Sequence, residues 1–397
     1  MTGASTGPRD VPWLDRWLDE HSSGLITFRR ELHQNPELGY AEHRTTARLA
    51  AALSGAGLQP HVLPSGTGLY CDIGSGERVV ALRADIDALP LQDIKDVPYA
   101  SAVPGVCHAC GHDAHTTAVL GAALALASAP ELPGRVRAIF QPAEESVPGG
   151  ALDAIDGGVL KDVERIFALH CDPKLETGRV GLRTGPITAA CDRVDVMLSG
   201  PGGHTARPHR TVDLVYALGQ VITDVPGLLS RRADPRHGMS LVWGAVQAGL
   251  AANTIPQSGT LTGTVRMLDR DAWEAAEGLV SALIEEVSAP TGATVEVRYE
   301  QGVPPVTNEA ASTAALRAGV LAALGPEAVA DTEQSLGGED FAWYLGHVPG
   351  ALARLGVRPP AATGPPLDLH QPTFDIDEGA LAVGVRVLAH TALTVLA

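Results

Sequence analysis

The first part of the chain alternates helical stretches of apolar residues with short apolar runs. Apolar residues at helical spacing predict a helix over Val11–His33, which Asn35 and Pro36 end, and a second helix over Thr45–Ala56. The short runs predict strands over His61–Leu63, Leu69–Ile73, Arg78–Arg83, Arg135–Phe140 and Arg165–His170, with a helix over Asp113–Ser128. Such alternation is typical of a mostly parallel sheet covered by helices.

The middle of the chain follows a different order of elements. It predicts strands over 192–199, Ser240–Gln247, Thr260–Arg266 and Thr294–Tyr299, and helices over Val212–Leu229 and Asp271–Ala289. This βαββαβ order is the ferredoxin-like unit. Strand–helix alternation resumes at Asn308–Leu324 and ends with a helix over Glu378–Leu396. We therefore predict an α/β fold with a discontinuous catalytic domain over 11–190 and 303–397, an inserted α+β domain over 191–302, and a mobile tail over 1–10.

Composition and charge narrow the classes of function. Hydrophobic residues make up 45% of the 397 residues, enough for a sizeable core, and the formal net charge is −17. A chain this acidic, without a basic cluster, is predicted to bind neither nucleic acid nor an anionic membrane surface. The N-terminal segment lacks the apolar core of a signal peptide, and no run of 18 apolar residues occurs, so we expect a cytoplasmic protein. Five cysteines do not make a disulfide framework.

The densest group of candidate metal ligands lies just before a predicted helix. Its members are Cys107, His108, Cys110, His112, Asp113 and His115, with a turn at Gly111. Thiolate and imidazole are typical ligands of zinc and neighbouring transition metals. A structural zinc site would need a second Cys-x-x-Cys, and a redox pair would need thioredoxin-like flanks; the chain has neither. The spacing favours metal ligation, with an inert, packed cluster as the open alternative.

Two adjacent carboxylates, Glu144 and Glu145, follow the apolar strand that ends at Phe140. Carboxylates at a strand end are costly unless they are paired or bound to a metal. Neighbouring side chains of an extended chain point to opposite sides. One carboxylate could therefore bind a metal while the other moves a proton. A solvated loop is the alternative.

Three further sites carry polar groups at predicted strand ends or in loops. Asp85 and Asp87 end an apolar strand, where a carboxylate could orient a metal-bound histidine or merely begin a turn. His170 and His370 each follow an apolar stretch. An isolated histidine in such a place is more often packed or solvated. Together with the two clusters above, however, these histidines would complete the ligand set of a metal.

Four segments match the motifs of one known family: Arg83–Pro90, His108–Asp113, Gln141–Glu145, and Gly202–His204 followed by Pro208. The chain resembles the aminoacylase and carboxypeptidase type of metallopeptidase. More narrowly, it is similar to the amidohydrolase branch, which holds hippurate hydrolases, N-acyl-amino-acid amidohydrolases and plant auxin-conjugate hydrolases. The resemblance extends over nearly the whole chain, from Arg30–Glu37 to Leu369–Pro372.

The resemblance implies a zinc-peptidase-like catalytic domain with a lid or dimerisation domain inserted in it. It implies two divalent metal ions per subunit, Zn, Mn, Co or Ni, with ligands Cys110, His112, Glu145, His170 and His370. Glu144 would be the general base for a metal-activated water, and Asp87 would orient a ligand. His204 would stabilise the oxyanion and contact the substrate, in one arrangement across a homodimer. Asn253 and Arg266 match segments that face the substrate.

The implied reaction is hydrolysis of the amide bond of an N-acyl amino acid, a small molecule, to a carboxylic acid and a free amino acid. A dipeptidase or exopeptidase of the same family is the alternative. A catalytically silent binding protein would not need the complete ligand set, and a nucleophilic hydrolase using Cys110 would leave Glu145, His170 and His370 without a role. One departure from the family pattern, Ser146-Val147-Pro148, lies just after the paired glutamates and leaves the acyl preference open.

Overall fold

The computed structural model describes residues 11–397, so the tail predicted over 1–10 lies outside the described residues. The chain forms two compact units. The first unit comprises the chain up to Gly185, Thr307–Glu333 and Asp340–Ala397. The inserted unit comprises Pro186–Val306 and Gln334–Glu339. The predicted insertion over 191–302 thus lies within the inserted unit.

An eight-stranded mixed sheet forms the centre of the first unit, in the order β1-β2-β4-β3-β5-β16-β6-β15. Its strands are β1 Pro60–Val62, β2 Leu69–Gly74, β3 Val79–Asp85, β4 Arg135–Gln141, β5 Val163–Glu176, β6 Val180–Leu182, β15 Val329–Asp331 and β16 Gly350–Arg358. The pairs β3–β4, β3–β5, β5–β16 and β6–β15 are parallel, and the other three pairs are antiparallel. The predicted α/β class with a mostly parallel sheet is confirmed.

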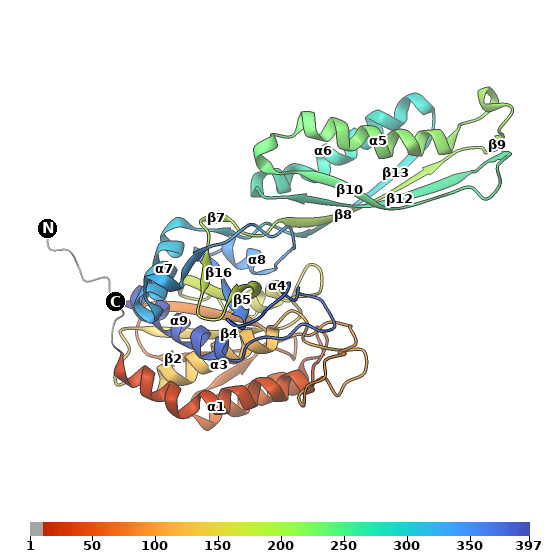
Figure 1. The fold of residues 1–397 in the computed structure, drawn as a ribbon. Coiled ribbons are helices and arrows are strands. Elements are labelled where there is room, and N and C mark those ends of the chain that lie inside the picture. Colours follow the sequence, from red (N-terminus) through yellow and green to blue (C-terminus); the bar gives the residue numbers. More distant parts are fainter. Residues whose placement is uncertain (1–10) are drawn as a thin grey trace. The chain divides into compact units, whose positions relative to one another are not determined.

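Helices cover this sheet because its strands are apolar on both faces. Every residue of β3 is buried, as expected for a strand between two covered faces. The helices are α1 Pro12–Gln34, α2 His43–Gly55, α3 His112–Ala127, α4 Ala151–Asp156, α7 Ala310–Leu324, α8 Phe341–Leu345 and α9 Gly379–Leu396. Helices α3, α7 and α9 contact the sheet and α1 packs on α3 and α9 (Figure 1). Helix α9 is long and apolar enough to cross a membrane, but 61% of it is buried within the protein.

The inserted unit is a four-stranded antiparallel sheet with two helices. Its main elements are β8 Ala190–Ser199, α5 Leu214–Arg232, β10 Ser240–Ala248, β12 Ser258–Met267, α6 Arg270–Ser288 and β13 Thr294–Val303. The strand order β10-β12-β8-β13 places the first strand between the third and fourth, as the βαββαβ pattern requires. A short ladder joins β9 (Gly203–His204) to β11 (Thr254–Ile255) in this unit, and another joins β7 (Gly185–Pro186) to β14 (Thr307–Asn308) at the boundary with the first unit. Single 3₁₀ turns occur at Pro208–Arg210, Pro235–His237, Ala289–Thr291 and Pro326–Ala328.

Several features of the first unit and its boundary differ from the prediction. Strand β5 runs six residues beyond His170, because β16 pairs with it as far as Glu176 across a bulge. Strand β16 itself was not predicted, since its small residues and a central arginine hide the apolar pattern. Residues 334–339 belong to the inserted unit rather than to the catalytic domain, because Ser335 exchanges backbone hydrogen bonds with Ile187 and Ala189.

Candidate metal centre

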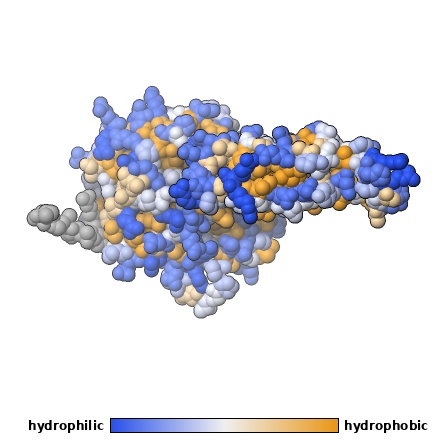
Figure 2. Space-filling model, turned by 90° about the horizontal axis from the view of Figure 1, so that it is seen from above, coloured by the Kyte–Doolittle hydropathy of each residue, from blue (hydrophilic) through white to orange (hydrophobic). Residues whose placement is uncertain are grey.

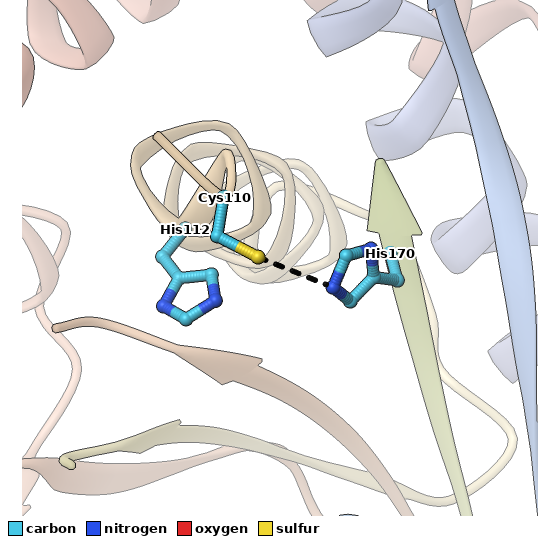
Figure 3. A group of neighbouring side chains, drawn as sticks. All are labelled: Cys110, His112 and His170. Carbon is cyan, nitrogen blue, oxygen red and sulfur yellow. Dashed lines mark hydrogen bonds between the residues drawn. The ribbon is translucent and has the colours of Figure 1, made fainter. Parts of the chain in front are cut away.

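A left-handed glycine begins helix α3 and separates two of the predicted ligands. Gly111 has φ 89°, and a Cβ atom at this position would lie 2.8 Å from Sγ of Cys171. Only glycine adopts such a conformation and such a close approach without strain. Cys110 and His112, on either side of it, lie at the start of α3, and the Cys110 thiol points toward His170 on β5 (Figure 3).

Cys110, His112 and His170 form a buried ligand group, which we call the inner group. One ligand atom from each lies within 4.8 Å of the others. Sγ of Cys110 is 3.6 Å from Nε2 of His170, and Nδ1 of His170 is 2.9 Å from the carbonyl oxygen of Cys171. Nδ1 therefore carries the proton and donates a hydrogen bond to the carbonyl. The lone pair of Nε2 is then left for a metal.

Asp87 orients His112 in the same way. Nδ1 of His112 lies 3.1 Å from Oδ1 of Asp87 and 3.0 Å from its carbonyl oxygen, while Nε2 is buried and has no hydrogen-bond partner. The other oxygen of Asp87 accepts a hydrogen bond of 2.9 Å from the backbone N–H of Glu145. One carboxylate thus fixes the ring of one predicted ligand and the backbone of another, which is typical of the groups around a metal.

The outer group consists of Cys110, Glu145 and His370, and it shares the thiol with the inner group. Oε1 of Glu145 lies 3.3 Å from Nε2 of His370, yet this buried oxygen has no hydrogen bond of acceptable geometry. The side chain of His370 is 54% exposed, whereas that of His112 is 1% exposed. The two groups therefore differ in access to solvent.

The two glutamates are not on opposite sides of the chain, as an extended segment would place them. Oε2 of Glu144 and Oε1 of Glu145 each lie 3.8 Å from Nε2 of His112. The physical reason is a turn: Ala143 has φ 54°, in the left-handed region, and its carbonyl accepts hydrogen bonds from the N–H groups of Ser146 and Gly150. Both carboxylates consequently face the ligand cluster.

Buried charges set the protonation of the inner group. Burial raises the pKa of Asp85, but His112, His115 and Arg83 outweigh burial and hold that pKa well below its usual range. Burial lowers the pKa of His112, but Asp85 and Cys110 outweigh burial and raise it. Burial raises the pKa of the Cys110 thiol well above its usual value. A cation at this point would replace the protons of the thiol and the imidazole.

Burial and the nearby Arg354 lower the pKa of His170 well below its usual value. The ring is therefore neutral near pH 7, which is the protonation state that binds a metal.

Two positioning residues were not predicted. His115 lies in the predicted cluster but received no role; its Nδ1 is 2.7 Å from Oδ1 of Asp85, and its Nε2 accepts a hydrogen bond of 2.8 Å from the N–H of Cys171, next to His170. Glu42 is fully buried and accepts a hydrogen bond of 2.8 Å from the N–H of Ala143, just before the paired glutamates. Nothing in the local sequence marks Glu42, because its partner is 101 residues away.

The donor set fits a pair of divalent metal ions. All five predicted ligands are in one cluster, in two groups that share Cys110. Two of their ligand atoms, Nε2 of His112 and Oε1 of Glu145, are buried and form no hydrogen bond of acceptable geometry, a cost that a bound cation would reduce. Mixed S, N and O donors suit zinc and its first-row neighbours.

The substrate residues predicted on the inserted unit fall into two places. His204 is exposed, its Nδ1 accepts a hydrogen bond of 3.0 Å from the N–H of Ala206, and its neighbour Thr205 donates to the carbonyl of Asn253 at 3.2 Å. Arg266 lies on β12 opposite Cys191 and donates to the carbonyl of Leu336. His204 lies in the separate β9–β11 ladder, whose Ile255 comes three residues before the start of β12. Arg266 lies near the far end of β12, about 26 Å from its start at ~3.3 Å per residue.

Comparisons with known proteins identify the family of the chain. The model of "Peptidase family M20/M25/M40" matches residues 81–394. The chain belongs to this family. The predicted resemblance is thereby confirmed, and with it the class of enzyme: a hydrolase of amide bonds from a metallopeptidase family.

Two curated relatives and one solved structure are informative. The chain is 39% identical over 360 residues to an N-acetyl-L-cysteine deacetylase of Bacillus subtilis, covering 90% of this chain and 84% of that protein. It is 50% identical over 382 residues to a Rhodococcus jostii protein named as a candidate glutamate–cysteine ligase 2-3, covering 96% of this chain but 47% of that longer protein. The crystal structure of Bacillus subtilis YXEP, described as a dinuclear metal binding peptidase of the M20 family, is 35% identical with a TM-score of 0.83, covering 95% of this chain and 99% of that one.

Proposed function

We propose that this M20-family hydrolase cleaves the amide bond of N-acyl amino acids with two divalent metal ions per subunit. The observation that carries the proposal is the convergence of two ligand groups on Cys110, beside a second carboxylate, Glu144. The dinuclear metal site of the YXEP structure and the N-acetylcysteine specificity named for the deacetylase support it. Cys110, His112 and His170 would hold the inner ion, and Cys110, Glu145 and His370 the outer ion.

Water and an amide react slowly because water is a weak nucleophile and the amide carbonyl a weak electrophile. Two divalent ions held by these ligands would polarise the carbonyl and would lower the pKa of the attacking water to ~7. Oε2 of Glu144 lies 3.8 Å from Nε2 of His112. From this position Glu144 would take the proton of the attacking water. The same carboxyl group would then deliver that proton to the leaving amine. Asp87 would keep His112 and Glu145 in place during both steps.

His204 would donate a hydrogen bond to the developing oxyanion, with Asn253 beside it and Arg266 on another part of the substrate. Arg266 lies about 26 Å along β12, at ~3.3 Å per residue, from the strand end that follows the His204 ladder, which is further than one acyl amino acid reaches. We therefore place the two residues on the substrate from different subunits of a homodimer.

An exposed edge of the inserted unit supports this dimer. Strand β10 is an edge strand, and Val242 and Val246 on it are 63% and 55% exposed. Figure 2 views this unit from the side of its helices α5 and α6, where apolar residues lie among hydrophilic ones. An unpaired edge strand with apolar side chains is a template for pairing with a second chain. Val246→Lys should convert a dimer into a monomer in light scattering.

A substrate panel tests the proposed reaction. Metal-free protein reloaded with Mn²⁺ or Zn²⁺ is given N-acetylcysteine, other N-acetyl amino acids, N-benzoyl and long-chain acyl amino acids, and dipeptides. We expect release of the free amino acid from one of the acyl classes, and no release without metal. Preference for dipeptides over every acyl substrate would assign the protein to the peptidases of the family instead.

A further inference from the structure

The segment that carries His370 is held from outside the ligand cluster. Asp375 lies five residues beyond His370, and both of its carboxylate oxygens are engaged by other elements. Nη2 of Arg29, on α1, donates to Oδ1 at 3.1 Å. The phenol of Tyr99 donates to Oδ2 at 2.7 Å. These two residues lie 346 and 276 positions earlier in the chain, so the contacts exist only in the folded state.

Arg29 reaches the segments of both ligand groups. Its guanidinium is fully buried, and Nε lies 2.7 Å from Oδ2 of Asp113, the residue next to the ligand His112. The same guanidinium bonds Asp375, on the segment of the ligand His370. A planar guanidinium offers several donors in a fixed geometry. It therefore fixes the distance between the two segments more firmly than a flexible contact would.

The backbone at His370 needs such support. His370 has φ 61°, in the left-handed region that residues other than glycine seldom adopt. Its N–H donates to the carbonyl of Ala109 at 2.8 Å, next to Cys110. Residues in this conformation persist only where the surrounding structure fixes them. The side chain is half exposed, so packing around the ring does not fix it.

We propose that Arg29, Tyr99 and Asp375 form a latch that positions His370 as a ligand of the outer metal ion. The inference rests on the proposed dinuclear function. The three latch residues contact neither metal nor substrate; they act through the 370–375 segment. The latch meets the inner group's segment through Arg29 and Asp113, while its members Tyr99 and Asp375 act on the His370 side. Asp87 and the carbonyl of Cys171 orient His112 and His170. Loss of the Tyr99–Asp375 contact should therefore weaken the outer ion and spare the inner one.

The test measures Mn²⁺ binding to metal-free full-length protein by titration calorimetry, together with the electron paramagnetic resonance of bound Mn²⁺. Tyr99→Phe removes one hydrogen bond and keeps the ring, and Asp375→Asn removes the charge. In both variants we expect the weaker of two Mn²⁺ sites to lose about 10–100-fold in affinity, the usual scale for a group that orients a ligand. The tighter site should be unchanged, and the spectrum at equal Mn²⁺ should shift from coupled to single ions. Tyr70→Phe, in β2, is the matched control and should bind like the unmodified protein.

The outcomes separate the latch from the dinuclear centre. Equal affinities in Tyr99→Phe and the unmodified protein would overturn the latch, as would a parallel loss of both ions. Fewer than two Mn²⁺ in the unmodified protein would overturn the dinuclear function itself. If Asp375→Asn does not fold, Tyr99→Phe alone decides. Activity that returns at high Mn²⁺ in Tyr99→Phe would further support the latch, because added metal does not repair a misfolded chain.

Discussion

One buried carboxylate in the first unit and one in the inserted unit differ in their hydrogen bonding. In the inserted unit, Asp192 accepts hydrogen bonds from the indole of Trp273, the phenol of Tyr299 and the N–H of Gly302, at 2.8, 2.6 and 2.9 Å. In the first unit, Oε1 of Glu145 is buried and forms no hydrogen bond of acceptable geometry, although Nε2 of the half-exposed His370 lies 3.3 Å away. A satisfied buried group stabilises a fold, whereas an unsatisfied one is a cost that the fold bears for another purpose. The difference points to function in the first unit and to structure around Asp192.

The comparison is tested most strongly by removing the thiol that the two ligand groups share. Cys110→Ala takes one ligand from each group, so we expect loss of bound metal and activity at the detection limit. Metal content by elemental analysis and amide hydrolysis are the measurements. Cys107→Ala is the matched control: this buried thiol, whose pKa burial raises to about 11, belongs to neither ligand group and should leave metal content unchanged. Equal metal loss in the two variants would refute the ligand assignment.

A second prediction separates the adjacent glutamates. Glu144→Gln keeps size and shape but removes the proton acceptor, so kcat should fall by ~10²–10⁴ with both metals retained. Glu145→Gln should instead lose the outer ion, because its carboxylate belongs to that group. Steady-state kinetics and metal analysis on the same preparations distinguish the two. Metal loss in Glu144→Gln with retention in Glu145→Gln would show that the roles are reversed.

The inserted unit enters the chemistry, in our proposal, through an exposed histidine. His204→Ala should lower kcat and kcat/KM by similar factors of ~10²–10³, the scale for one lost oxyanion donor. Metal content and thermal stability should not change, since the ring lies outside the core and the ligand groups. A raised KM with a normal kcat would instead show that His204 binds the substrate equally well in the ground state and in the transition state. Mixing His204→Ala with Arg266→Ala protein tests the dimer, because a mixed dimer has one intact site.

The smallest effect concerns stability and pH. Glu309 begins α7, where its carboxylate accepts hydrogen bonds from the N–H groups of Ala311 and Ser312; contacts with Ser312 lower its pKa to about 2. Because the folded pKa lies below the ordinary value of 4.5, the stabilisation is present above that pH and is lost as pH falls toward 2. Glu309→Ala should lower the free energy of unfolding by about 0.5–2 kcal/mol at pH 7 and by less at pH 3.

Urea unfolding at the two pH values measures this difference. Asp269, which accepts a hydrogen bond of 2.8 Å from the N–H of Ala272 at the start of α6, gives the matched variant in the inserted unit. If Asp269→Ala and Glu309→Ala shift the same single transition, the two units unfold together. If each variant shifts a separate unfolding transition, the units unfold independently. Metal removal should then shift only the unfolding transition of the first unit.

Much of the fold follows from local sequence. The helix predicted over Val11–His33 is observed as α1 over Pro12–Gln34, and the βαββαβ order of the insertion is observed in full. These elements depend on periodicity and on end signals such as Pro36, which act within a few residues. Strand β16 was not predicted, because a central strand with small residues and a buried arginine shows neither the alternation of a half-buried strand nor the spacing of a helix.

The sequence by itself determined which side chains are candidate ligands, because Cys110, His112 and Glu145 lie in short motifs whose chemistry is visible locally. Only the tertiary structure decided which of their atoms form no hydrogen bond, which carboxylates face the same ring, and that Arg266 lies near the end of β12 that is remote from the His204 ladder. The groups that hold the ligands, such as Glu42 and Asp375, could not be predicted either. Their partners lie 101 to 346 residues away, and contacts over such separations are set by packing, which no local pattern records.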